Sequence, residues 1–278
     1  MRVGAILAAC LFVAGTLCAR EASPSRGINF YSIEREIALG KQLSTELERQ
    51  IKLADDPILS EYINRVAQNL ARQSEIAIPV QVRIIESGER NAFTLPGGHI
   101  YINSAMLKLT ESESELAFVL AHELGHVAAR HATREATRSQ LIQAGSIPLS
   151  VLGGWSGVGL RELASQGSKL GFLEGSRRFE SQADRLGIDF MDRAGYDPAA
   201  AINMFERIEV TERKRPNRIA RLYEDHPVTA ARIDETQKYV NRLRARNEYI
   251  LNTSEYEEMR VRAVALEQRR VAAESPSR

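Results

Sequence analysis

The segment "LAFVLAHELGHVAARHA", residues 116–132, contains three of the five histidines of this 278-residue chain. Its apolar residues and its lack of proline predict a helix. At about 100° per residue, His122 and His126 lie about 40° apart on one helix face and could bind one metal ion together. His131 falls about 140° from His126 by the same arithmetic. We therefore expect His131 to point away from that ion, as a polar residue near a helix end.

The pattern His-Glu-x-x-His adds a carboxylate to this pair. Glu123 lies too far round the helix to join His122 and His126 easily in one coordination shell, but it can reach a metal-bound water and accept its proton. A surface helix carrying the string by chance would leave polar groups inside an apolar face, where they need partners. The pattern therefore predicts zinc, with Glu123 as the general base.

A catalytic zinc usually has three protein ligands and leaves one position for water. The metzincin continuation requires glycine at position 129 and histidine at position 132, where this chain has Ala129 and Ala132, so that class is excluded. A glutamate from a second helix is the remaining common solution. The downstream candidates are Glu162, Glu174 and Glu180.

Glu180 has a second carboxylate one helical turn later, because Asp184 follows it at i+4. One carboxylate can bind zinc, and the other can accept the free N–H of a metal-bound histidine. A solvated acidic face paired with Arg177, Arg178 and Arg185 explains the same spacing. Spacing alone supports the two readings equally.

The strings "AHELGH" and "ESQADRLG" closely resemble the HtpX/BepA-like zinc metallopeptidases, family forty-eight of the metallopeptidases, which also contains the CAAX prenyl proteases. Three further stretches fit this family, at 91–103, 193–205 and 225–233. The resemblance covers about residues 35–240.

This resemblance implies that zinc is bound by His122, His126 and Glu180, with Glu123 as the catalytic base. It also implies a supporting or proton-donating role for Asp184.

The resemblance further implies a place near zinc for His226. Pro227 biases His226 away from helical conformation, so we expect a loop just before the helix that carries Arg232. Three roles remain open for His226. It could stabilise the oxyanion, occupy the open zinc position and keep the enzyme latent, or be an ordinary loop residue.

Composition narrows the class of protein. An apolar content of 44% supports a real core, and a net charge of +1 without a basic stripe argues against nucleic acid as a partner.

The first residues, 1–19, have one arginine and then an apolar run, which predicts a secretory signal. Both cysteines, Cys10 and Cys18, lie in it, so no disulfide is expected in the mature chain. A lipid anchor on one of them is the less favoured alternative.

We expect an α+β fold that is mainly helical: a zincin-like metallopeptidase with an active-site helix, a small β-sheet and a second, glutamate-bearing helix. The metallopeptidase domain is placed at 30–245, and a charged helical tail at 246–278 is expected to fray from Glu267 onward. No internal repeat is visible, so tetratricopeptide repeats are not expected.

The active-site helix is expected over 111–143, beginning at a capping box of Thr110 and Glu113. Residues 145–159 are expected to form a loop over the cleft or a membrane-touching flap. The other expected helices are at 33–53, 57–73, 161–194, 198–212 and 228–245, and the expected strands are at 79–85 and 99–103.

These patterns predict a secreted, periplasmic endopeptidase with one zinc per chain, acting on unfolded or misassembled envelope proteins in quality control. The strand at 99–103, if it lies at the sheet edge, would hold an extended substrate. Peripheral contact with the membrane or with outer-membrane assembly machinery is a further expectation. One alternative is a chaperone-like binding protein with structural or latent zinc. Another is a membrane-associated protease, although no spanning segment follows the signal.

Overall fold

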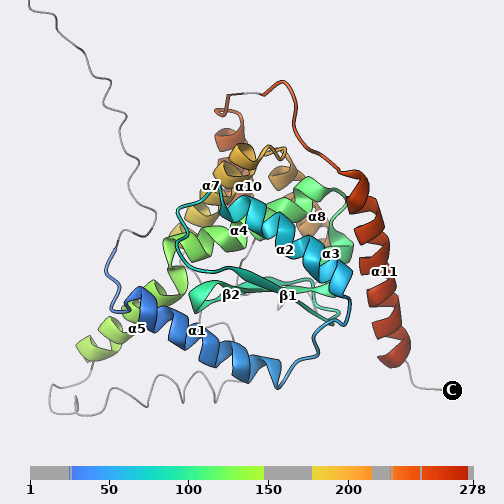
Figure 1. Ribbon diagram of the computed structural model, residues 1–278. Helices are drawn as coiled ribbons and strands as arrows, with labels where there is room; N and C mark the ends of the chain where they lie inside the picture. The colour runs from blue at the N-terminus through green and yellow to red at the C-terminus, as the bar shows by residue number, and fades with distance from the viewer. Residues whose placement is uncertain are drawn as a thin grey trace, which may run out of the picture.

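The computed structural model describes residues 25, 27–146, 177–214, 226, 228–244 and 246–274. In these ranges the fold is mainly helical and contains a three-stranded sheet (Figure 1), as the sequence predicted. No helix within the described ranges is long and apolar enough to cross a membrane.

The helices of the described part are α1 (Ile33–Glu48), α2 (Pro57–Ala71), α3 (Ser104–Leu109), α4 (Glu113–Ala129), α5 (His131–Ser146), α7 (Arg177–Ala194), α8 (Ala200–Lys214), α10 (Ala230–Val240) and α11 (Ser254–Glu274). The strands are β1 (Gln81–Ile85), β2 (Ala92–Leu95) and β3 (His99–Asn103), and the 3-10 turn η1 (Pro96–Gly98) joins β2 to β3.

Most of the expected elements are confirmed, with ends shifted by a few residues. Strand β2 and helix α3 were not expected, because both are short and lack a clear period. Residues 147–159 of the expected loop and 161–176 of the expected helix lie outside the described residues.

The sheet has the order β1-β3-β2, with β1 parallel and β2 antiparallel to β3. The strand at 99–103 is therefore central, and the expectation that it forms the sheet edge is wrong. In the tight turn η1, Gly97 and Gly98 have positive φ angles of 77° and 83°. This turn reverses the chain, so that β3 runs back antiparallel to β2. The edge strand on this side is β2.

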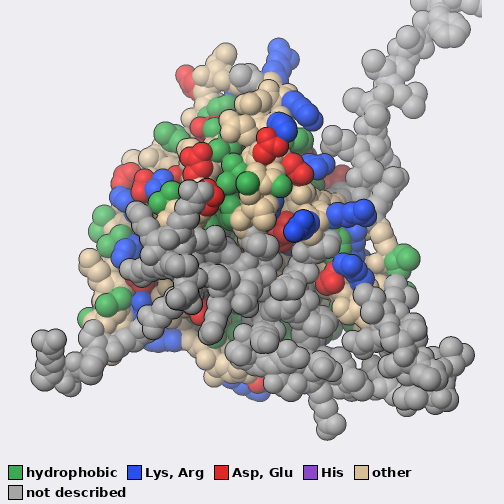
Figure 2. Space-filling view, turned by 180° about the vertical axis from the view of Figure 1, so that it is seen from behind, with side chains coloured by type: hydrophobic (Ala, Val, Ile, Leu, Met, Phe, Trp, Pro, Cys, Tyr) green, Lys and Arg blue, Asp and Glu red, His purple; other side chains and the backbone are tan. Residues whose placement is uncertain are grey.

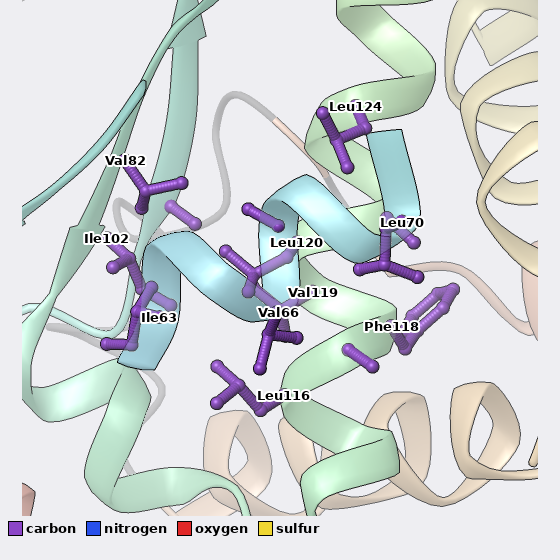
Figure 3. Packing of buried hydrophobic residues seen from close by; sticks show 14 of the residues in the cluster. Ile63, Val66, Leu70, Val82, Ile102, Leu116, Phe118, Val119, Leu120 and Leu124 are labelled. Carbon is purple, nitrogen blue, oxygen red and sulfur yellow. The ribbon is translucent and has the colours of Figure 1, made fainter. Parts of the chain in front are cut away.

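Both faces of the sheet are covered by helices (Figure 1). On one face, Ile102 belongs to the same buried cluster as Ile63 of α2 and Leu120 of α4 (Figure 3). On the other face, Leu95 and Tyr101 pack in a smaller cluster with apolar residues of α1. Each fully buried side chain of this size contributes about 1.5–3 kcal/mol, so the sheet and helix α4 are held rigidly together.

Helix α4 begins two residues later than the predicted capping box. Ser112 is the N-cap, and its hydroxyl accepts a hydrogen bond from the backbone N–H of Glu115 at 3.1 Å. The hydroxyl of Thr110 instead donates to the carbonyl of Leu107. The helix start was thus predicted correctly to within one turn, but with the wrong cap.

The expected helix over 111–143 is wrong as a single element. It breaks at Arg130, which adopts a left-handed conformation with φ 54° and ψ 39°. The side chain of Arg130 holds this break, because its Nε donates to Glu36 Oε2 at 2.7 Å and its Nη2 donates to the carbonyl of Tyr31 at 2.7 Å. Helix α5 therefore leaves the active-site helix in a new direction.

The charged C-terminal segment is helical, as expected, and packs on α2 and α3 (Figure 1). The expected fraying from Glu267 onward is wrong for residues 267–274, which continue α11. Glu267 is buried and accepts a hydrogen bond from the Ser104 hydroxyl at 2.8 Å. The residues that α11 adds to the main core are Tyr256, Met259, Ala263 and Leu266.

The surface carries charges of both signs. Figure 2 shows Lys and Arg side chains interspersed with Asp and Glu over the described part of one face. This mixture is the one expected for a chain with a net charge of +1.

Candidate metal centre

Helices α4 and α7 cross at close range because each has a glycine at the contact. A β-carbon on Gly125 would lie 2.7 Å from the carbonyl oxygen of Ala183, and one on Gly187 would lie 3.0 Å from the carbonyl carbon of Ala121. Larger residues would push the helices apart. This crossing brings Glu180, near the start of α7, against the two histidines of the α4 motif.

The three predicted ligands meet at this crossing. His122 Nε2 lies 3.2 Å from His126 Nε2. The Glu180 carboxylate lies 3.5 Å from each, through Oε2 to His122 and Oε1 to His126. All three side chains are buried, and Glu180 is only 1% exposed. The reading of Glu180 as part of a solvated acidic face is therefore wrong.

His226 brings a fourth donor atom to the same point. Its Nδ1 lies 3.0 Å from both carboxylate oxygens of Glu180 and 3.4 Å from His122 Nε2. We call His122 Nε2, His126 Nε2, the Glu180 carboxylate and His226 Nδ1 the four-donor group. Its atoms all lie within 4.8 Å of one another.

Most of the donor spacings in the four-donor group fit a tetrahedral zinc ion. Bonds of about 2.0–2.1 Å to nitrogen and oxygen place neighbouring ligand atoms of a tetrahedron about 3.3 Å apart. Five of the six donor pairs are 3.0 Å to 3.5 Å apart, and the sixth, between His126 and His226, is within 4.8 Å. Imidazole and carboxylate are also the donor types that zinc takes in such sites.

Asp184 supports the group from behind. Its Oδ1 lies 2.9 Å from His122 Nδ1, and this close contact on the far side of the ring leaves Nε2 to face the other donors. Asp184 is 3% exposed, so the acidic-face reading is wrong for this residue too. Arg232 donates two hydrogen bonds to the Asp184 carboxylate, from Nε at 2.9 Å and from Nη2 at 2.7 Å. Its Nη1 lies 3.1 Å from Glu180 Oε2.

From the sequence, Arg232 was placed only on the helix that follows His226. Its contacts with Asp184 and Glu180 were not predicted. Its guanidinium also donates to the carbonyl of His226 at 3.2 Å, which ties the loop to the site. The only feature of the sequence that could have indicated these contacts is the position of Arg232 six residues after His226.

Electrostatics favour a cation at the four-donor group. Burial alone would raise the pKa of the Glu180 carboxyl, but His226 and His126 lower it well below its usual range. Burial would likewise raise the pKa of Asp184, and Arg232 lowers it. Burial opposes the charge on His122, yet hydrogen bonds to Asp184 and Glu180 raise its pKa to about 10. Two ionised carboxylates thus draw positive charge to this point.

Glu123 lies beside the four-donor group and outside it. The Thr94 hydroxyl, from strand β2, donates to Glu123 Oε2 at 2.7 Å. The other oxygen, Oε1, lies 3.7 Å from His226 Nε2. This arrangement fixes the carboxylate with one oxygen toward the site. The other candidate glutamates, Glu162 and Glu174, lie outside the described residues.

His131 lies outside the four-donor group, as expected, but its contact with the ring of His126 was not expected. Because the helix breaks at Arg130, the angle calculated for a continuous helix does not apply. The Nδ1 atoms of His131 and His126 are 3.1 Å apart, on the side of the His126 ring remote from the four-donor group. Burial lowers the pKa of His131 to about 4, so its ring is neutral at neutral pH.

A His-Glu-x-x-His helix, a crossing helix that carries a glutamate and a small sheet with its edge at the site together define a zincin-like metallopeptidase. Residues 57–240 match Peptidase family M48. The chain belongs to this family, and membership implies a bound metal ion, usually zinc.

The chain is similar to several proteins with protease names. It is 29% identical over 244 residues to the beta-barrel assembly-enhancing protease of Yersinia pestis, covering 83% of this chain and 49% of that protein. It is 29% identical over 194 residues to the mitochondrial metalloendopeptidase OMA1 of Schizosaccharomyces pombe, covering 67% and 55%. It is 27% identical over 197 residues to the metalloprotease LoiP of Escherichia coli (strain K12), covering 70% and 76%. The chain spans about half the length of the first two relatives.

Proposed function

We propose that this chain is a zinc-dependent endopeptidase that hydrolyses unfolded or misassembled proteins of the cell envelope. It holds one zinc ion per chain, with His122, His126 and Glu180 as permanent ligands. The observation that carries this proposal is the four-donor group with Glu123 beside it.

The bound ion supplies Lewis acidity toward the scissile carbonyl and the attacking water. Glu123 takes the proton of that water and returns it to the leaving amine. The Asp184 carboxylate keeps the His122 ring oriented, and its bidentate contact with Arg232 favours this supporting role over proton donation. Arg232 offsets part of the buried negative charge of Glu180 and Asp184.

Thr94→Val is expected to lower kcat/KM by about 10–100-fold, because a hydrogen bond to a charged group contributes about 1.5–3 kcal/mol. Without the hydroxyl, the Glu123 carboxylate loses the contact that orients it. Thr94→Ser keeps the hydroxyl and is the matched control. Steady-state cleavage of a quenched peptide measures both variants. Equal kcat/KM for Thr94→Val and the wild type would contradict this orienting role.

We assign substrate binding to the edge of β2 rather than to β3. Asn103 N–H donates to the carbonyl of Asn91 at 2.9 Å, so alternate residues of the antiparallel pair bond to β3. By that alternation, Ala92 and Thr94 direct their backbone N–H and C=O groups outward. Among the described residues no strand pairs with this edge. An extended peptide added there passes directly beside Glu123.

An apolar pocket supports a preference for unfolded substrates. It adjoins Glu123 and His226 on the α8 side of the site, where an apolar side chain next to the scissile bond would fit. Such side chains are buried in folded proteins and exposed in unfolded ones. The apolar residues that line the pocket are Ala92, Met106, Phe118, Val119, Met204, Phe205, Ile208 and Val228.

A second candidate function follows from the four-donor group itself. Zinc sites with four protein ligands and no open position are usually structural. A chaperone-like binding protein with such a zinc ion would hold unfolded chains on β2 without cutting them. We favour a latent peptidase over this chaperone-like protein. In the latent peptidase, His226 would occupy the zinc position that water needs during turnover.

His226→Ala is expected to raise basal peptide cleavage at least about tenfold, because it opens the fourth position and leaves three ligands, the usual number in catalytic sites. Zinc content is expected to stay near one per chain. A fall of about 10²–10³-fold would instead identify His226 as an oxyanion stabiliser. Unchanged cleavage would make His226 an ordinary loop residue. If the wild type and His226→Ala both bind zinc and neither cleaves the peptide, the chaperone-like function is favoured.

We place the mature chain in the periplasm, on the strength of the signal predicted for residues 1–19. Peripheral contact with outer-membrane assembly machinery is part of the same proposal. It is supported by similarity to a protein named for enhancing beta-barrel assembly. The proposed role is proteolytic quality control of envelope proteins.

A further inference from the structure

We infer that His131 is a positioning residue for His126, acting as a neutral hydrogen-bond acceptor for its ring. The inference rests on the proposed zinc site. His126 directs Nε2 to the four-donor group, which leaves its Nδ1–H in need of an acceptor. The Nδ1 of His131 lies 3.1 Å from that atom. His131 is 3% exposed, so this acceptor is part of the protein interior.

The proton positions follow from the next contact along the chain of hydrogen bonds. His131 Nε2 lies 3.1 Å from Gln182 Oε1, and an amide oxygen only accepts. His131 therefore carries its proton on Nε2, and the lone pair of Nδ1 faces His126. The opposite tautomer would set two N–H groups against each other. The ring of His131 also stacks on Phe179, with centroids 4.2 Å apart and an interplanar angle of 18°, but its orientation is set by the two hydrogen bonds.

The two histidine ligands thus have different partners. His122 is oriented by the Asp184 carboxylate, whereas His126 is oriented by a neutral imidazole. The site already buries the carboxylates of Glu180 and Asp184, which are offset in part by Arg232. A third carboxylate behind His126 would add another buried negative charge at a large desolvation cost. A neutral acceptor orients the ring without that cost.

The test is the zinc dissociation constant of the full mature chain, measured by competition with a chromophoric chelator. His131→Leu is expected to weaken zinc binding by about 10–100-fold, the usual effect of losing a partner that orients a metal ligand. His131→Asn keeps an acceptor oxygen and is expected to bind within about fivefold of the wild type. Phe179→Leu removes the stacking and keeps the hydrogen bond, so zinc binding should change by less than about threefold.

Urea unfolding of the metal-free variants separates positioning from general packing. A positioning role predicts that zinc affinity follows the acceptor, with Asn better than Leu at position 131, whatever the stability of the metal-free chain. If wild type and His131→Leu bind zinc equally, or if Asn and Leu are equally weak, the inference is overturned. If the wild type binds no zinc at all, the proposed function fails with it, so the two failures are distinguishable.

A second measurement needs no variant. Long-range proton–nitrogen correlation spectra of histidine side chains distinguish the two neutral tautomers. The zinc-loaded chain is expected to have His126 protonated on Nδ1 and His131 protonated on Nε2. A charged His131, or one protonated on Nδ1, would overturn the inference even if His131→Leu does not fold.

Discussion

Glu123→Gln is expected to reduce peptide hydrolysis by about 10²–10⁴-fold, the range that a positioned general base contributes. Zinc content is expected to stay near one per chain, because Glu123 lies outside the four-donor group. Glutamine has nearly the same shape and can still accept from the Thr94 hydroxyl, but it cannot take a proton from water. The loss should therefore appear in kcat, with little change in folding.

The measurement is cleavage of a quenched peptide together with metal analysis of the same sample. Glu235→Gln, on an exposed face of α10, is the control for a lost surface charge. It is expected to match the wild type within about twofold, since exposed ion pairs contribute about 0–1 kcal/mol. Normal zinc with hydrolysis within tenfold of wild type would remove Glu123 from the role of base.

Glu180→Ala is expected to lose most of the bound zinc, and hydrolysis with it. Glu180 supplies the carboxylate of the four-donor group and lies 3.5 Å or less from the donor atoms of His122, His126 and His226. Its removal also leaves Arg232 without one of its two buried acidic partners. Removal of one partner from a buried ionic contact costs about 3–5 kcal/mol, so the site should be weakened as well as short of a ligand.

Asp184→Asn provides the graded comparison. Asn can still accept from His122 Nδ1, so zinc is expected to remain bound with about 10–100-fold weaker affinity, the cost of weakening a partner behind a ligand. Metal analysis after dialysis against a weak chelator separates the two variants. Equal metal loss in Glu162→Ala, with Glu180→Ala unaffected, would show that the wrong glutamate had been assigned.

The zinc motif was predictable because its geometry is local. His122 and His126 are four residues apart on one helix, and the 3.6-residue period alone puts them on one face. Glu180 could be placed only with the help of family resemblance. The contact that brings it in is the close crossing of α4 and α7 at Gly125 and Gly187, between helices far apart in the chain.

The contact between His131 and His126 could not be calculated from the angle per residue of a helix. The expected direction of His131 assumed one continuous helix, but the chain breaks at Arg130. Arg130 is held in its left-handed conformation by Glu36 and by the carbonyl of Tyr31. These partners precede it by more than ninety residues, |i−j| being 94 and 99. No pattern in the neighbouring sequence indicates such a break, because Arg is a good helix former.

The edge strand was missed for a similar reason. Strand β2 has four residues, all of them buried, so it lacks the alternation that identified β1. Which strand lies at the edge depends on how β1 and β2 pair with β3, and no local pattern in the sequence gives this pairing. The sequence predicted the sheet, but only the structure shows which strand lies at its edge.

We propose that the four-donor group binds zinc and that Glu123 acts beside this ion as the general base of peptide hydrolysis. The most direct measurement is casein digestion by the mature chain and by His226→Ala, before and after removal of metal with a chelator. We expect digestion to stop when the metal is removed and to return with one equivalent of zinc per chain, more strongly in His226→Ala. Digestion that continues without metal, or no digestion by either zinc-loaded form, would contradict a zinc-dependent peptidase with Glu123 as its base.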